Sequence, residues 1–76
     1  MIKEYDRVVL TEDLPDENLK AGDVGTVVMI YGDHEGYELE FFNLCGETIA
    51  VVTAYTRQVR PVDAGEISHA RPLAAA

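Results

Sequence analysis

Apolar residues in this chain occur in short runs separated by glycine, proline and acidic residues. The runs cover residues 5–10, 24–31, 37–41, 48–53 and 58–62. In 37–41 apolar and acidic residues alternate with a period of two, which is typical of a strand with one buried face. The run 24–31 is rich in β-branched residues, which favour strands. No stretch has the 3.6-residue period of an amphipathic helix, so the pattern predicts five short strands and a single helical turn at 55–57.

Polar, glycine-containing segments connect the runs. Residues 32–36 and 43–47 have the length of hairpin connections, and Gly22 is expected to supply the positive φ of a turn. Gly25 lies inside a strand, which indicates a bulge or a close approach of another group to the backbone. Such short connections leave no room for crossover helices. The sequence therefore predicts an all-β fold, a five-stranded antiparallel meander closed into an SH3-like barrel.

The strand pattern also predicts which side chains form the core. The expected core residues are Val8, Val27, Ile30, Leu39, Phe41, Ile49 and Val51. From residue 63 onward the chain has no sustained hydrophobic period. We therefore expect a barrel domain over residues 1–62 and a short disordered, flexible C-terminal tail over residues 63–76.

Length and charge narrow the classes of function. A chain of 76 residues has room for one core and little room for a buried active site, so we expect no enzyme and no catalytic residues. Fourteen acidic residues oppose six basic ones, and the net charge of −8 disfavours nucleic acid as a partner. No apolar run approaches the ~18 residues of a membrane span, and the N-terminus lacks an apolar signal segment, so we expect a cytoplasmic protein with no membrane partner.

The potential metal and redox residues are few. Cys45 is the only cysteine, which excludes an internal disulfide and favours a reducing compartment. His34 and His69 are far apart in the sequence, and with one thiol they do not make a structural zinc set. We therefore expect no metal and no cofactor.

Acidic and aromatic residues are the candidates for binding a partner. The candidate partner-binding residues are Asp13, Asp16, Glu17, Tyr31, Glu38, Glu40 and Tyr55. The first three crowd one loop but lack the ligand spacing of an EF-hand. The two glutamates share one face of a strand, where outward acids also serve solubility. The two tyrosines can act as aromatic anchors or can cap the core.

The glycine-and-valine segment 22–30 resembles a core strand of KOW-type and other SH3-like barrels. Together with the segments 6–11, 13–15, 19–20, 46–48 and 58–61 it makes the chain similar to a bacterial family catalogued as domain of unknown function 4926, over residues 1 to about 62. The resemblance implies a small protein without catalytic residues, encoded in arrangements suggestive of toxin and antitoxin pairs. It implies a binding role but provides no functional residues to transfer.

Three functions are compatible with these observations. The leading hypothesis is a small acidic, non-enzymatic protein-binding module, an antitoxin or immunity-type partner of a basic protein, because complementary charge steers encounter. The first alternative is a KOW-like nucleic-acid or ribosome-associated module, which the missing basic patch opposes. The second is an SH3-like accessory subunit of an enzyme. The sequence leaves a homo-oligomer open.

Overall fold

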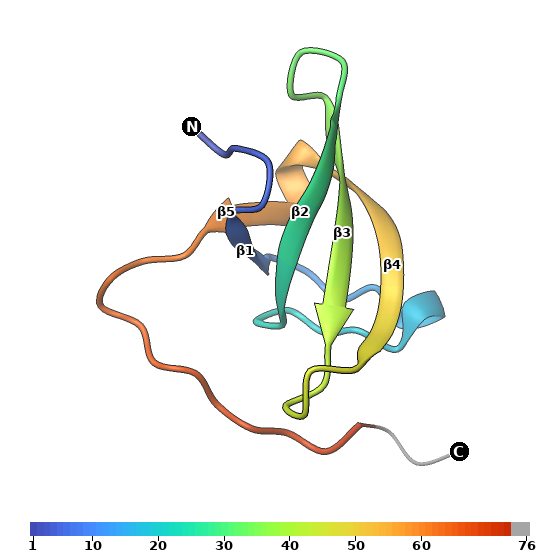
Figure 1. Ribbon diagram of the computed structural model, residues 1–76, viewed down its shortest axis with the longest axis vertical. Helices are drawn as coiled ribbons and strands as arrows, with labels where there is room; N and C mark the ends of the chain where they lie inside the picture. The colour runs from blue at the N-terminus through green and yellow to red at the C-terminus, as the bar shows by residue number, and fades with distance from the viewer. Residues whose placement is uncertain (74–76) are drawn as a thin grey trace.

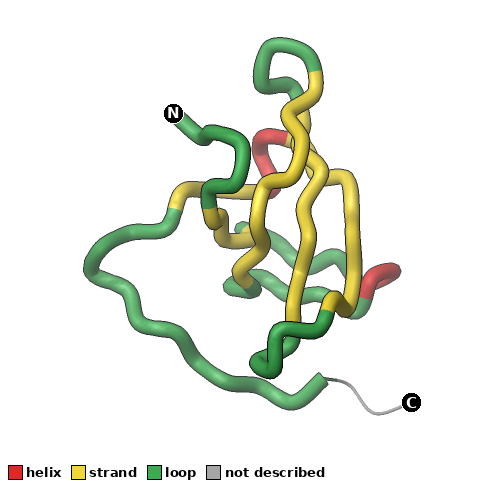
Figure 2. Tube along the Cα trace, viewed as in Figure 1, coloured by secondary structure: helices red, strands yellow, loops and turns green. Residues whose placement is uncertain are grey.

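Five antiparallel strands form one strongly curved sheet in the computed structural model, which describes residues 1–73 (Figures 1 and 2). The strands are β1 (Arg7–Leu10), β2 (Val24–Tyr31), β3 (Gly36–Phe42), β4 (Thr48–Tyr55) and β5 (Val59–Pro61). Two single-turn 3-10 helices, η1 (Pro15–Glu17) and η2 (Thr56–Gln58), interrupt the loops. The sheet order is β4-β3-β2-β1-β5, which confirms the all-β, five-stranded, SH3-like prediction. The barrel is not closed by a ladder, because β4 and β5 are not paired in the described chain and η2 spans the gap between them.

The core lies between the two halves of the curved sheet. Large side chains of β3 face small side chains of β4, since Tyr37 pairs with Ala54 and Phe41 pairs with Ala50. The buried cluster comprises Val8, Leu10, Leu19, Val27, Tyr37, Leu39, Phe41, Val52, Ala54 and Val59. Four predicted core residues are therefore confirmed, namely Val8, Val27, Leu39 and Phe41, and a fifth, Ile30, is half-buried against the cluster.

The prediction that Ile49 and Val51 belong to the core is wrong, because their side chains are 37% and 52% exposed. Residues 49–52 are all apolar, so the run has no alternation that distinguishes its two faces. The face is instead selected by pairing with β3, which directs Val52 toward Leu39 in the core. A strand has a period of two, so its alternate residues then point to the outer surface.

Gly25 marks a close approach and not a bulge. A Cβ atom at this position would lie 2.8 Å from Cζ of Phe41, so the aromatic ring occupies the space that a side chain would need. The bulge in β2 lies further along, where Val27 pairs with Leu39 and Met29 pairs with Glu38. Val28 is the extra residue between them.

The segment after β5 swings away from the barrel and returns along its lower end (Figure 1). Two ion pairs tether it, Arg60 with Glu66 at 2.6 Å and Arg71 with Asp23 at 2.5 Å. Between this segment and the barrel lies a groove of about 620 Å³. The predicted flexibility of residues 63–76 stays a prediction, and its last part, 74–76, lies outside the described residues.

Candidate partner-binding surface

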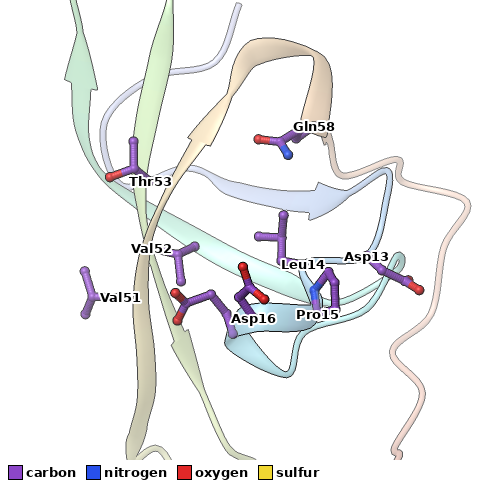
Figure 3. A pocket seen from close by; sticks show the side chains of 9 residues that line it. Asp13, Leu14, Pro15, Asp16, Val51, Val52, Thr53 and Gln58 are labelled. Atoms are coloured by element: carbon purple, nitrogen blue, oxygen red, sulfur yellow. The ribbon is translucent and has the colours of Figure 1, made fainter.

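β4 is an edge strand of the sheet, and a groove runs beside it (Figure 3). The groove has a volume of about 610 Å³ and separates β4 from the loop that contains η1. Its lining residues are Asp13, Leu14, Pro15, Asp16, Glu17, Val51, Val52, Thr53 and Gln58. The groove is therefore lined on one side by the predicted acidic loop and on the other by a strand more than thirty residues further along the chain.

Two leucines hold the acidic loop in place. Leu14 and Leu19 exchange backbone hydrogen bonds of 2.9 and 3.1 Å, and the side chain of Leu19 is buried in the core. Pro15 begins η1 with its fixed φ, and Asn18 ends it in the left-handed conformation at φ 59°. Because the leucines anchor both ends, Asp16 between them stays exposed.

The loop acids have different roles. A carboxylate oxygen of Asp13 accepts a hydrogen bond of 2.9 Å from the backbone N–H of Ala21, and in Figure 3 this side chain points away from the groove. The Asp16 carboxylate lies above η1, between the side chains of Leu14 and Val52 in the view of Figure 3. In the described chain, no side-chain hydrogen bond engages Asp16 or Glu17. Asp13 therefore stabilises the loop, while the other two carboxylates are available to a ligand.

Gln58 closes the upper part of the groove. Its amide nitrogen donates to Glu12 at 2.9 Å, and its amide oxygen accepts the backbone N–H of Tyr55 at 2.8 Å. This side chain joins the acidic loop to η2. It also satisfies the last backbone donor of β4.

The outer face of β3 and β4 carries the predicted glutamates in a hydrogen-bonded network. Glu38 accepts hydrogen bonds from the hydroxyls of Tyr31 at 3.2 Å and Thr53 at 2.7 Å. Glu40 accepts one from Thr48 at 2.6 Å. Partial burial and the hydrogen bond to Glu38 raise the pKa of Tyr31 above its usual value of 10.0. The tyrosine hydroxyl is therefore a stable donor, and both glutamates are held in fixed positions.

Apolar side chains lie among these acids. Val51 is the direct cross-strand neighbour of Glu40, and Met29 is that of Glu38. Tyr55, at the end of β4, is 63% exposed, and the Arg57 guanidinium lies 5.1 Å from its ring centroid. We call the outer face of β3 and β4, together with the groove between β4 and the η1 loop, the β4 surface.

The structure thus brings six of the seven predicted binding residues to the two sides of the sheet edge at β4, while the Asp13 side chain points away from the groove and holds the loop. Tyr31 of β2, Glu38 and Glu40 of β3 and Tyr55 of β4 occupy the outer face, and the acidic loop borders the groove. Sequence reasoning missed Val51, Val52 and Thr53 as part of the surface. The uninterrupted apolar run 49–52 was a signal that both faces of this strand contact apolar groups. That any of these residues binds a partner stays a prediction.

The potential metal ligands do not gather in the part of the chain that the structure describes. No three side chains of the histidine, cysteine, aspartate and glutamate types are close enough to hold an ion. Cys45 is an exposed free thiol. Within residues 1–73 there is also no helix of the length and hydrophobicity that a membrane span requires.

Comparisons with known proteins give one match. The family described as "Domain of unknown function (DUF4926)" matches residues 4–61, which span all five strands and both 3-10 turns. Neither the curated proteins nor the solved structures include a match to the chain. Because the family match covers well over half of the chain, this protein belongs to the DUF4926 family.

Proposed function

We propose that this chain is a small acidic, non-enzymatic protein-binding module whose partner is a basic protein. The observation that carries the proposal is the placement of acids on both sides of an exposed apolar strand. Asp16 and Glu17 border the groove, and Glu38 and Glu40 lie on the outer face. Complementary charge increases association rates and disfavours wrong partners, while exposed apolar side chains supply the contact area.

The distribution of charge supports this assignment. Glu66 and Arg71 in the C-terminal segment cancel, so the whole net charge of −8 belongs to residues 1–63. A field of this sign attracts basic surfaces and repels phosphate, which weighs against a KOW-type nucleic-acid module. An antitoxin or immunity-type protein that neutralises a basic toxin is the specific role that we propose. The free thiol of Cys45 fits a cytoplasmic site for this encounter.

Photo-crosslinking tests the proposal. A photoreactive phenylalanine analogue replaces Val51 in one variant of the full chain and Tyr5 in a control variant. Both positions are exposed, but Tyr5 precedes β1 and lies outside the β4 surface. We expect the Val51 variant, and not the Tyr5 variant, to crosslink one basic protein in cells. Equal crosslinking from both positions, or capture of an acidic protein, would contradict the proposal.

Association kinetics with the purified partner then test the role of charge. Lowering the ionic strength from 0.15 M to 0.01 M lengthens the screening distance from about 8 Å to about 30 Å and should accelerate association. The variant Asp16→Asn with Glu17→Gln should associate more slowly and with weaker salt dependence. Its control, Glu4→Gln with Asp33→Asn, removes the same charge from exposed positions outside the surface. Salt-independent association would show that the acids do not steer the encounter.

A further inference from the structure

The free edge of β4 is the longest unpaired strand edge in the described structure. The sheet ends at β4 on one side and at β5 on the other. β5 has three residues and ends in Pro61, whereas β4 has eight residues and contains no proline or lysine. Natural edges are usually protected by short length, proline, lysine or a covering segment. Within the described residues, β4 has none of these protective features, and its free edge faces the groove.

The backbone groups on this edge lack protein partners. In an antiparallel pair, alternate residues direct their N–H and C=O groups away from the neighbouring strand. Across residues 1–73, no backbone hydrogen bond joins residues 48–54 to any segment other than β3. Only the N–H of Tyr55 is satisfied from elsewhere, by Gln58. The unpaired backbone N–H and C=O groups therefore lie within residues 48–54. They end at Tyr55, whose N–H is bonded to Gln58.

We propose that the partner contributes an extended basic segment that pairs with β4 as a sixth strand and lies in the groove opposite η1. This inference rests on the proposed function and specifies how the partner binds. An added strand lies about 4.8 Å from its neighbour, and main-chain hydrogen bonds supply its affinity. The groove of about 610 Å³ beside Val51, Val52 and Thr53 is the space that this strand occupies.

The two faces of β4 determine which side chains the added strand carries. In Figure 3 Val51 and Thr53 lie on one side of the β4 ribbon, while Val52 lies on the other side, toward Asp16. Side chains of a paired strand alternate in the same way. Residues beside Val52 therefore face the carboxylates of η1 and are basic. Residues beside Val51 and Thr53 lie on the outer face, where Val51 is exposed, and are apolar or β-branched.

Charge disfavours a second copy of this chain at the edge. Pairing of β4 with β4 would bring two chains of net charge −8 together. It would also place two acidic loops and two pairs of outer-face glutamates near one another. Repulsion between chains of the same net charge disfavours such an association. The occupant is consequently a different protein with a basic strand.

A synthetic peptide tests strand addition with the full chain. The probe has eight residues, the length of β4, with alternating lysine and valine. The control peptide has the same sequence with N-methylated valines, which keeps its charge but removes half of its backbone donors. Binding is followed at low salt by NMR and by amide hydrogen exchange, at peptide concentrations up to about 1 mM. We expect the probe to slow exchange within residues 48–54 while leaving β5 unchanged.

Two variants separate pairing from charge. The variant Asp16→Asn with Glu17→Gln should weaken peptide binding by roughly threefold to tenfold, since it removes two partly exposed ion pairs. The control Glu4→Gln with Asp33→Asn should bind like the parent chain. N-methylation should abolish the protection of β4. Equal binding of both peptides, absence of binding, or a dimer of the chain with protected β4 amides would each overturn the proposal.

The same measurements distinguish failure of this inference from failure of the proposed function. A partner that crosslinks at Val51 and associates in a salt-dependent manner, but leaves exchange of residues 48–54 unchanged, would refute strand addition. The protein-binding function would then stand. Absence of any partner at the β4 surface would refute both.

Discussion

Replacing Gly25 by alanine tests how closely the core packs beneath β2. The new Cβ would lie 2.8 Å from Cζ and 2.9 Å from Cε2 of Phe41, inside normal contact distance. Phe41 is only 2% exposed, so its ring has little freedom to move away. Overpacking of this kind costs about 1–3 kcal/mol. The φ of Gly25 is not positive, so alanine also removes unfolded-state entropy, which returns about 0.5–1 kcal/mol.

The difference between these two terms leaves a net loss of up to about 2.5 kcal/mol, and we expect about 1–2 kcal/mol because the buried ring has little room to move. In a domain of this size, a loss of 1 kcal/mol lowers Tm by about 4–8 °C. Thermal unfolding followed by circular dichroism measures the effect. Gly65→Ala is the matched control, because the nearest atom to its new Cβ is Oδ1 of Asp63 at an ordinary contact distance of 3.5 Å. The control should stay within about 0.5 kcal/mol of the parent.

A double-mutant cycle identifies the ring of Phe41 as the cause. Phe41→Leu removes the atoms that the new methyl group would meet, so the double variant should lose less stability than the sum of the single variants. A coupling energy of about 0.5–3 kcal/mol is typical of residues in contact. If the two losses add within about 0.5 kcal/mol, the steric explanation is wrong. A Gly25→Ala variant as stable as the parent would also refute it.

Three further predictions concern the core and the C-terminal segment. Phe41→Ala should cost about 3–5 kcal/mol in equilibrium unfolding, and a loss under about 1 kcal/mol would mean that the ring is not buried. Arg71→Ala should lower stability by no more than about 1 kcal/mol, because its pair with Asp23 is a partly exposed ion pair. Removal of residues 64–76 should leave the fold intact and cost no more than about 2 kcal/mol, because it removes this pair and the pair of Arg60 with Glu66; a collapse of the NMR spectrum on truncation would contradict this. The hydrogen bond from Arg60 lowers the pKa of Glu66 from 4.5 to about 2, so this pair should be fully formed above about pH 4.5 and be lost as the pH falls toward 2. An NMR titration of the Glu66 carboxyl carbon checks the direction, and a midpoint above 4.5 would rule out the pair.

The strands were predictable because their signals are local. Alternation in 37–41 directly identified Leu39 and Phe41 as inward-facing, and polar hairpin segments set the antiparallel order. β4 was located but its face was misassigned. Its apolar run has no period of its own, and its orientation depends on pairing with β3 and on the space that the β3 side chains leave.

The binding surface was predictable only as a list of residue types. Exposed acids and tyrosines could be selected from the sequence, since charge and aromatic character belong to single residues. That the loop around Asp16 borders Val52, and that Arg71 reaches Asp23, depends on contacts between segments far apart in the chain. No local pattern encodes such contacts.

The arrangement of the strand pairs also bears on the order in which the domain folds. β2, β3 and β4 are joined by short turns, whereas pairing of β1 with β5 brings Val8 beside Pro61. Closing so long a loop loses more chain entropy than forming a hairpin, so the three-stranded meander should form first. Truncation of Val52 should then slow folding, while truncation of Val59 should mainly accelerate unfolding. Stopped-flow kinetics would show the reverse if β1 and β5 nucleate the fold. On this order β4 is an open edge before β1 and β5 pair, so a basic strand that binds it engages the chain before the last strands have joined the sheet.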